Sequence, residues 1–258
     1  MLKELYTAAL GMQTQQTRLE VISNNMANAS SSGFKRASVF ERNLIDARAN
    51  FYNVPGQAEQ NDPPSGSYYD FSNGAYDETG SQLDVAIDGK GFFVLQDEAG
   101  ANYLTRSGHF KLSTDGTIEA MDGKMLMGES GPIRVAKEIL ESDGTSSPSS
   151  LNMKIDEHGD VAVNGSHVGT LKIASIANPN SLEQISNQNF IATDQTEMNF
   201  LPQEQISLRQ GWIENSNVNI INEMVSMIEL QRMYEAGSKV IQTNDSTLDY
   251  SIKLGKYY

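Results

Sequence analysis

Carboxylates are the residues with the greatest scope for chemistry in this chain, because 33 of its 258 residues are Asp or Glu. Asp84 and Asp88 flank a short apolar stretch, and Asp115 lies four residues before Glu119. General acid–base catalysis needs a carboxyl group with a raised pKa in a pocket. These acids lie in or beside Gly-containing turns, where Asp accepts hydrogen bonds from the nearby backbone. The pattern therefore favours turns and surface charge, and we expect no catalytic residue.

Two further motifs could in principle bind a cation or a nucleotide. Asp156-Glu157-His158-Gly159-Asp160 groups carboxylates with a histidine, but it lacks the ligand spacing of an EF-hand loop. Gly89-Lys90-Gly91 lacks the third glycine and the following helix of a dinucleotide-binding loop. His109 and His167 have no neighbour at metal-ligand spacing. The sequence thus predicts a hairpin turn at 156–160, no metal and no cofactor.

The formal charge of −14 is concentrated in the middle of the chain. Residues 1–50 hold six basic and four acidic residues, residues 213–258 hold four and six, and residues 51–212 hold nine and 23. An acidic surface disfavours nucleic-acid binding, which needs clustered basic residues. The sequence has no cysteine, which excludes disulfides and Cys-based zinc sites. The N-terminus lacks the apolar core of a secretory signal, and no stretch is apolar enough to span a membrane, so we expect no membrane insertion.

The N-terminal segment has an apolar heptad pattern about 25 residues long, with steps of three and four. The pattern consists of Leu5, Ala8, Met12, Gln15, Leu19, Ile22, Met26 and Ala29. Ser30-Ser31-Ser32-Gly33 follows, and a glycine with positive φ commonly ends a helix. The charges on the polar face cancel, unlike the basic face of a helix that lies on a membrane. We therefore expect a helix within residues 1–32 that packs against other helices.

A second amphipathic helix is predicted from about residue 218 to about residue 252. Asn217 and Asn219 are suitable N-cap residues, and Glu223 suits the first turn. One apolar face contains Ile221, Met224, Val225 and Ile228, and a stripe at spacings of seven contains Met227, Tyr234, Ile241 and Leu248. The methionines could line a ligand groove, but helix packing is favoured because Met fits imperfect seams. Such a helix is roughly 50 Å long, which exceeds what a small core covers.

The region between the helices has the pattern of a β domain. Asp88-Gly89, Asp115-Gly116 and Asp122-Gly123 separate short alternating runs, a strong signal for hairpins. Further strands are expected at 151–155, 160–164, 167–176 and 206–213. The predicted fold class is α+β, with paired terminal helices at 1–32 and 213–258, an extended linker at 33–74, and a mainly antiparallel β domain at 75–212.

Pairing the two helices would leave about half of each helix uncovered. Further copies of the same pair are the simplest cover, and head-to-tail contacts between identical subunits can build a helical filament. Asn24, Asn25 and Asn28 are neighbours on a helix surface, and uncharged amides can donate and accept hydrogen bonds across such a contact. An ordinary helix end in a monomer explains these residues equally well, so both interpretations stay open here.

Three stretches resemble the bacterial flagellar rod and hook family, and together they cover roughly half the chain. They are "LYTAALGMQTQQTRLEVISNNMANASSSGFKR", then "GSQLDVAIDGKGFFVLQ" with "YLTRSGHFKLSTDGTIEAMDGKMLMG", and finally "GWIENSNVNIINEMVSMIELQRMYEAGSKVIQTND". The resemblance implies a subunit of the basal-body rod, with the terminal helices in the inner layer of an axial tube and the β domain outside. It also implies torque transmission in the periplasmic space, no catalysis, and export through the flagellar type III apparatus without a cleaved signal.

Within that family, "YYDFSNGAYDETGSQLDVAIDG" and "MGESGPIRV" favour a proximal rod subunit, and a distal rod subunit is the alternative. The implied partners are other axial proteins, among them copies of this chain, and the export apparatus. The residues expected at the assembly interface are Leu5, Met12, Leu19, Ile22, Asn24, Asn25, Met26, Asn28, Gly33, Phe34, Asn217, Asn219, Met224, Met227, Ile228, Tyr234, Ile241 and Leu248.

A carbohydrate-active β domain is a further alternative. It would need an aromatic-lined cleft with two inward carboxylates. Tyr68, Tyr69 and Phe71 are the aromatic candidates, and Asp84 is a candidate carboxylate.

Overall fold

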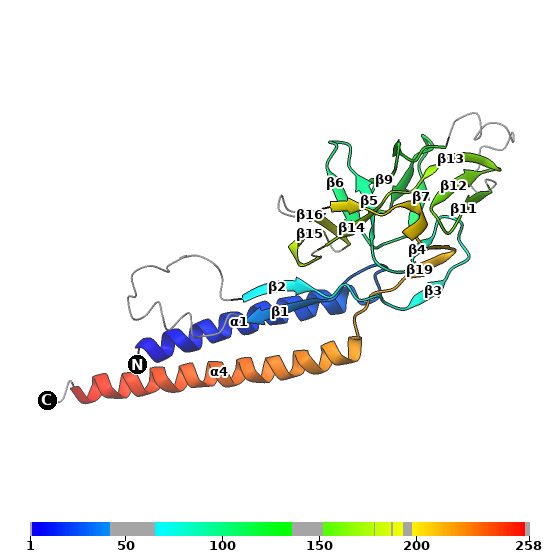
Figure 1. Cartoon of the computed structure of the whole chain (residues 1–258). Helices are drawn as coiled ribbons and strands as arrows, with labels where there is room; N and C mark the ends of the chain where they lie inside the picture. The colour runs from blue at the N-terminus through cyan, green and yellow to red at the C-terminus, as the bar shows by residue number, and fades with distance from the viewer. Residues whose placement is uncertain are drawn as a thin grey trace. The chain divides into compact units, whose positions relative to one another are not determined.

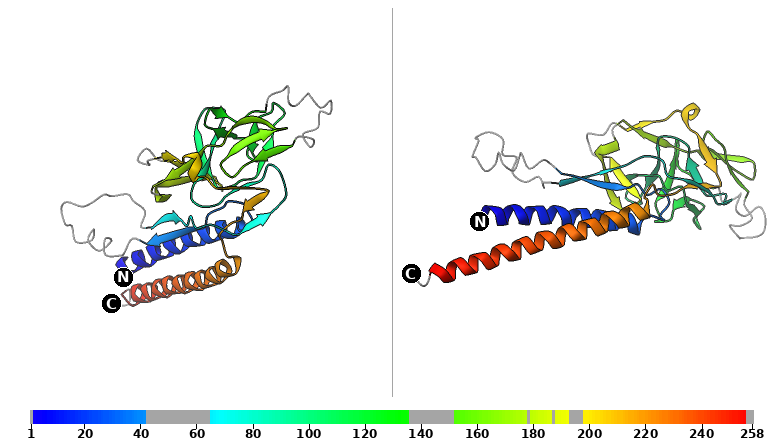
Figure 2. Two further views of the ribbon diagram at one scale, coloured as in Figure 1. Left: turned by 45° about the vertical axis from the view of Figure 1, so that its right-hand side comes forward. Right: turned by 90° about the horizontal axis from the view of Figure 1, so that it is seen from below.

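The computed structural model describes residues 2–41, 65–135, 152–177, 179–186, 188–192 and 198–255. The chain divides into two compact units, drawn in Figures 1 and 2. The helical unit comprises Met1–Ala27, Arg36–Asp70 and Val218–Tyr258, and the β unit comprises Asn28–Lys35 and Phe71–Asn217.

The helical unit is built on two antiparallel helices, α1 (Leu2–Ala27) and α4 (Ile220–Gly255). Figures 1 and 2 show them side by side, with the start of α1 and the end of α4 at the same end of the pair. Met12 of α1 lies against Gly237 of α4, where an added Cβ would be 3.4 Å from the Met12 Cγ. The two helices contain 26 and 36 residues, which correspond to about 39 and 54 Å. Both helices were predicted from their apolar spacing.

The helical unit also contains a two-stranded antiparallel sheet, formed by β1 (Ala37–Glu41) and β2 (Ser65–Tyr69). Both strands fall inside the range 33–74, for which the sequence indicated an extended linker. Helix α1 ends at Ala27, before the predicted limit of residue 32. The chain turns there, since the Ser31 N–H donates to the Asn28 carbonyl at 3.0 Å.

The β unit contains short strands joined by tight turns and two 3-10 turns, η2 (Pro179–Ser181) and η3 (Gln203–Gln205). The strands are β3 (Tyr76–Glu78), β4 (Val85–Ile87), β5 (Phe92–Gln96), β6 (Asn102–Thr105), β7 (Phe110–Leu112), β8 (Ile118–Ala120), β9 (Met125–Gly128), β10 (Gly131–Pro132), β11 (Met153–Ile155), β12 (Asp160–Val163), β13 (Ser166–Thr170), β14 (Ile173–Ile176), β15 (Leu182–Ser186), β16 (Asn189–Ala192), β17 (Met198–Phe200), β18 (Leu208–Gln210) and β19 (Trp212–Glu214).

Among the described residues, the largest sheet has ten strands, and its pairings are antiparallel. Its main path runs β15-β16-β6-β5-β9-β8-β7, with β10 paired to β9 and β14 paired to β5 and β17. A separate sheet has the order β11-β12-β13. Two smaller sheets pair β18 with β4 and β19 with β3. The predicted α+β class, with a mainly antiparallel middle, is confirmed.

One apolar core fills the β unit and joins the large sheet to the β11-β12-β13 sheet. Phe93 is fully buried and packs edge to face on Phe110, with ring centroids 5.1 Å apart. The same core includes Leu95, Ile118, Leu126, Val161, Val163, Leu171 and Ile173. Each fully buried side chain of this size stabilises the fold by about 1.5–3 kcal/mol, so the β unit has a core of its own.

Candidate assembly surface

A polar cluster lies where the end of α1 meets the start of α4. We name it the Asn25 cluster (Asn25, Arg36, Ala37 and Glu223). Asn25 is fully buried; its Nδ2 donates to the Ala37 carbonyl at 2.8 Å, and its Oδ1 accepts the Ala37 N–H at 2.9 Å. The same Nδ2 lies 3.4 Å from Glu223 Oε2. Glu223 is fully buried and accepts the Arg36 Nε–H at 2.6 Å. The cluster therefore joins the end of α1, the start of β1 and the first turn of α4.

Helix α4 begins with a side-chain cap just before this cluster. The Asn219 Oδ1 accepts the Asn222 N–H at 3.1 Å, and the Asn219 carbonyl accepts the Glu223 N–H at 3.0 Å. Such a cap stabilises a helix start by about 1 kcal/mol. It fixes where the helix begins, and hence which side chains face α1.

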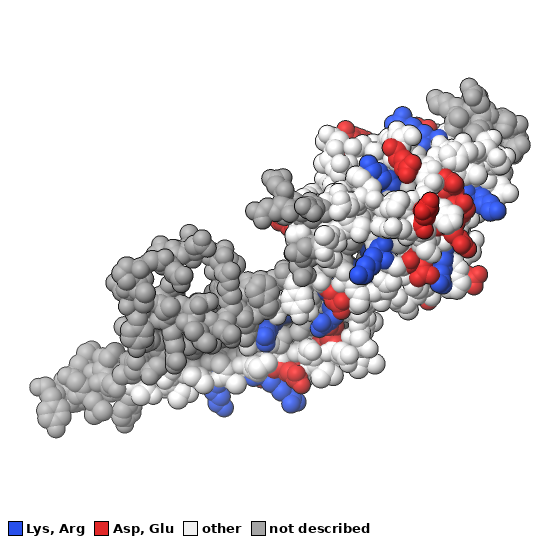
Figure 3. Space-filling view, in the orientation of Figure 1, with Lys and Arg blue, Asp and Glu red and all other residues white. Residues whose placement is uncertain are grey.

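The outer side of α4 carries an exposed apolar row, which we name the Ile221 face: Ile221, Met224, Val225 and Ile228. These side chains are 72%, 49%, 51% and 51% exposed. Their spacing of three, four and seven places them on one side of the helix. Leu230, by contrast, is buried in the same helix. This row is therefore exposed along one side of the first turns of α4, and Figure 3 shows Lys, Arg, Asp and Glu on one side of the molecule.

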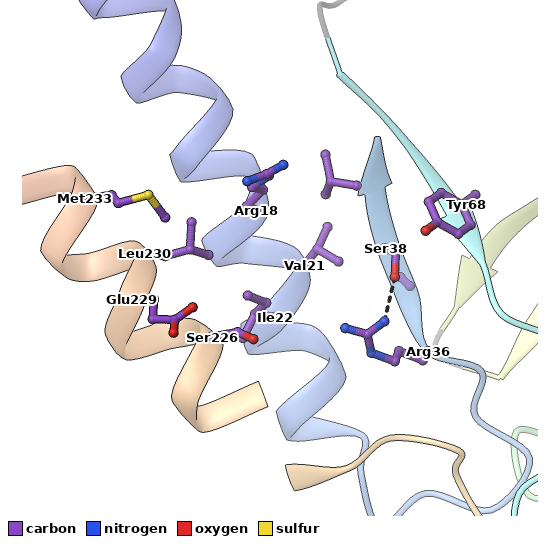
Figure 4. Close-up of a pocket in the computed structure, with 12 residues that line it drawn as sticks. Arg18, Val21, Ile22, Arg36, Ser38, Tyr68, Ser226, Glu229, Leu230 and Met233 are labelled. Carbon is purple, nitrogen blue, oxygen red and sulfur yellow. Dashed lines mark hydrogen bonds between the residues drawn. The ribbon is translucent and has the colours of Figure 1, made fainter. Parts of the chain in front are cut away.

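A groove opens in the helical unit between α1, α4 and the β1–β2 sheet. It has a volume of about 340 Å³ and is lined by Arg18, Val21, Ile22, Arg36, Ala37, Ser38, Val39, Tyr68, Ser226, Glu229, Leu230 and Met233. Figure 4 shows Ile22 of α1 beside Leu230 of α4, with Arg36 on the β1 side. The Arg36 Nη1 donates to Ser38 Oγ at 2.8 Å, which holds that guanidinium along the strand. The groove thus combines an apolar interior with charged residues at its margin.

Most of the residues predicted for the assembly interface lie in the helical unit, at different depths. Met12, Leu19, Ile22, Met26, Met227 and Ile241 are half-buried, whereas Asn24, Asn219, Met224, Ile228 and Tyr234 are exposed. Leu5 and Leu248 lie in α1 and α4, but their side chains are outside the described part of the chain. Asn217 is half-buried in the β unit, where its Nδ2 donates to the Ser72 carbonyl at 3.2 Å. For these residues, the contact with another subunit stays a prediction.

Four of the predicted interface residues are buried within this chain: Asn25, Asn28, Gly33 and Phe34. The Asn25 amide is used in the Asn25 cluster, and the Asn28 Oδ1 accepts the Ser31 hydroxyl at 3.3 Å. Gly33 has φ +69°, and a Cβ there would lie 2.2 Å from the Ser107 nitrogen. These positions therefore shape the fold of the single chain, and their contact with another subunit stays a prediction.

The β unit buries an ion cluster near the point where its chain segments enter and leave. Lys35 Nζ lies 2.6 Å from Glu214 Oε1, and Arg106 Nη1 lies 3.3 Å from Glu214 Oε2, with all three side chains at most 3% exposed. Burial lowers the pKa of the Arg106 guanidinium, and the nearby Glu214 carboxylate opposes that shift. Lys35 also donates to the Ser72 carbonyl at 2.7 Å. The cluster holds residues 35, 72, 106 and 214 together.

The residues considered for carbohydrate chemistry are divided between the two units. Asp84 is buried, and its carboxylate bonds to His109 Nδ1 at 2.5 Å and to the Thr79 hydroxyl at 2.6 Å. Phe71 packs on Phe92 at 5.4 Å in the β unit, whereas Tyr68 lines the groove of the helical unit. Asp156 accepts the N–H groups of His158 and Asp160, as a turn residue does.

No cluster of metal-ligating side chains occurs among the described residues. Within the same part of the chain, neither long helix is apolar enough to be a candidate membrane span.

Sequence reasoning missed the groove. Arg18, Val39 and Tyr68 line it, but none of them stood out as a contact residue. Strands β1 and β2 are separated by residues 42–64, and no turn motif of two or three residues joins them. The pairing that builds this wall of the groove therefore left no short-range signal, whereas the helical walls could be found from their apolar spacing.

Comparison with known proteins gives a consistent result along the chain. Residues 5–35 match the family described as "Flagella basal body rod protein", residues 86–163 match "Flagellar hook protein FlgE/F/G D1 domain", and residues 209–254 match "Flagellar basal body rod FlgEFG protein C-terminal".

Curated relatives match over nearly the whole chain. Flagellar basal-body rod protein FlgG of Agrobacterium fabrum is 30% identical, covering 95% of this chain and 96% of the relative. FlgG of Buchnera aphidicola subsp. Schizaphis graminum is 31% identical, covering 96% and 98%. Flagellar basal-body rod protein FlgF of that organism is 27% identical, covering 97% and 96%. The chain therefore belongs to the flagellar basal-body rod protein family and is a structural subunit of that rod.

Proposed function

We propose that the helical unit carries the contacts that build this subunit into the axial shaft of the flagellum, so that the shaft can transmit torque. The observation that carries this proposal is the Ile221 face, whose four apolar side chains are exposed on one side of α4. Contiguous exposed apolar residues mark interaction surfaces in soluble proteins. Neighbouring axial subunits, including other copies of this chain, would cover that face.

The same proposal gives the β unit a structural role. It has an apolar core of its own, and the Asp84 and Asp156 carboxylates accept hydrogen bonds within the unit. We propose a subunit without enzymatic activity that is exported by the flagellar type III apparatus and resides in the periplasmic part of the rod.

The experiment is a charge substitution on the Ile221 face. Val225→Asp would place a carboxylate in a contact between subunits, where an unpaired charge costs several kcal/mol. We expect cells with this variant to lose motility and to lack the subunit in purified basal bodies, while the soluble protein keeps its unfolding temperature. Gln242→Asp is the matched control, because Gln242 is an exposed α4 residue outside the face. Normal incorporation of Val225→Asp would refute the proposal.

A second experiment is needed to determine the position of this subunit along the rod. The sequence motifs favour the proximal rod protein, FlgF, with the distal rod protein, FlgG, as the alternative; relatives of both names match this chain. An image of basal bodies with this subunit tagged in the β unit would locate it. Density next to the inner membrane supports the proximal position, and density next to the hook supports the distal one.

A further inference from the structure

The groove of the helical unit has a lining of both polar and apolar side chains. Val21, Ile22, Val39, Leu230 and Met233 supply apolar lining. An apolar cavity of about 150 Å³ holds one benzene-sized ligand, and this groove has about 340 Å³. It therefore has room for two apolar side chains of the size of isoleucine.

We propose that this groove receives the Ile221 face of a second copy of the chain. This inference rests on the proposed function and adds the surface on which that face docks. The face offers Ile221, Val225 and Ile228 at helical spacing, so two of these side chains one turn apart can enter the groove together. A helix lying in an apolar groove through such residues is a recurrent mode of recognition.

The charges around the two surfaces are complementary. Arg18, Arg36 and Glu229 place two positive groups and one negative group at the groove, and Arg36 pairs with Glu223 of the same chain. Arg232 and Glu235 follow Ile228 within two turns of α4, and both are exposed. Glu229 of one copy can therefore meet Arg232 of the next copy. Opposed charges at the margin of an apolar contact set its register more than its strength.

The two surfaces lie on different sides of one helix, so they cannot satisfy each other within one chain. Ile228 and Met233 are five residues apart, which is about 140° around the helix axis. A contact between unlike surfaces of identical subunits is heterologous, and it leaves one groove and one face open at the ends of every oligomer. Each added copy therefore presents the surface needed by the next copy, as growth of an axial tube requires.

Cysteine cross-linking tests this pairing directly, because the chain contains no cysteine of its own. Ile228→Cys labels the face, and Val39→Cys labels the groove. The two variants are expressed together in one cell, and basal bodies are purified, oxidised and also treated with a short thiol cross-linker. We expect a covalent dimer at least tenfold more abundant than with either variant alone, and the doubly substituted chain should give a ladder of longer oligomers.

Other results would overturn the inference. Dimers from Ile228→Cys alone would mean that two faces meet each other, and basal bodies that contain both variants but show no cross-link would exclude the groove. Gln242→Cys paired with Val39→Cys is the control and should not cross-link. If Val225→Asp blocks incorporation while the cysteine pair fails to cross-link, the proposed function stands and only the groove assignment falls.

A charge exchange gives a second measurement that does not depend on thiols. Glu229→Arg should reduce the amount of subunit in basal bodies at least fivefold, and the added change Arg232→Glu should restore it. Thermal unfolding of both variants checks that the soluble chain is unaffected. Equal incorporation of Glu229→Arg and the original chain would count against the proposed register.

Discussion

The two units of the chain treat their apolar side chains in opposite ways. In the β unit, the large exposed apolar residues Met121, Ile185 and Phe200 lie on a turn and on two different strands. The Lys172 ammonium lies 3.8 Å from the centre of the Phe200 ring. In the helical unit, the exposed apolar residues of the Ile221 face lie together on one side of α4, within about two turns. Scattered exposure is normal for a soluble protein, whereas a continuous row indicates a surface that another molecule covers. The β unit thus has its own apolar core, whereas the helical unit exposes a row of apolar side chains on α4.

The largest effect should come from removing the buried anion of the β unit. Glu214→Gln would leave Lys35 and Arg106 buried without a countercharge, and breaking a buried ion pair typically costs about 3–5 kcal/mol. We expect the unfolding midpoint in urea to fall by a corresponding amount. Glu204→Gln, which changes an exposed carboxylate, should stay within about 0.5 kcal/mol. Similar midpoints for the two variants would contradict the structural role of the ion cluster.

Two alanine substitutions, one in each unit, test whether apolar side chains are buried in the β unit and exposed in the helical unit. Phe93→Ala removes a fully buried ring and should destabilise the chain by about 3–5 kcal/mol. Ile228→Ala removes an exposed side chain and should change the free energy of unfolding by less than about 0.5 kcal/mol. In basal bodies the order of the two variants should be reversed. When incorporation is expressed per amount of folded protein, Ile228→Ala should incorporate less than Phe93→Ala. Strong destabilisation by Ile228→Ala in the monomer would show that the Ile221 face packs within the chain.

A smaller effect is expected at the Asn25 cluster. Asn25→Ala leaves the Ala37 N–H and carbonyl without their buried bonds, which costs about 1–3 kcal/mol. Thermal unfolding of the full chain measures this change. Asn24→Ala, at an exposed position of the same helix, is the matched comparison and should have a smaller effect. If Asn24→Ala were the more harmful in the monomer, the assignment of Asn25 as an internal structural residue would be wrong.

The smallest expected effect is a pH dependence confined to the β unit. Hydrogen bonds from Thr170, with further ones from His167 and Gln203, hold the pKa of Asp160 below its usual value. Because the folded-state pKa is the lower one, the unfolded chain binds more protons as the pH falls below about 4, so this stabilisation is present above that pH and is lost in acid.

Urea titrations from pH 2.5 to pH 7 measure that loss. Asp160→Asn should flatten the decline in stability below about pH 4, while leaving the remaining slope from other carboxylates. Glu183→Gln, at an exposed position, should leave the profile unchanged. Identical profiles for the original chain and Asp160→Asn would remove Asp160 from the acid response.

Features that depend on local spacing could be predicted from the sequence. The steps of three and four identified both helices, and Asp122-Gly123 identified the turn between β8 and β9, where Gly123 has φ +87° and its N–H donates to the Ala120 carbonyl at 3.0 Å. The row Ile221, Met224, Val225 and Ile228 was also recognised as a single face. Helix and turn geometry relate neighbouring residues, so the sequence contains this information directly.

Features that depend on distant partners could not be predicted. Lys35 and Glu214 are 179 positions apart in the chain, and no periodicity relates them. The asparagines of α1 were recognised as polar contact residues, but the bonds from Asn25 to Ala37 in its own chain were not predicted. Spacing identifies the type of contact that a residue can make, whereas the choice of partner depends on the folded arrangement.

Gly237, the α4 residue that lies against Met12 of α1, affects how α4 can bend. Gly237 and Ser238 lie near the middle of a 36-residue helix, and Gly–Ser pairs are among the few places where long helices change direction. Glycine weakens the helix there by about 1 kcal/mol relative to alanine. The two halves of α4 can therefore follow different axes, which would let a long straight element adapt to the curvature of a narrow cylindrical wall.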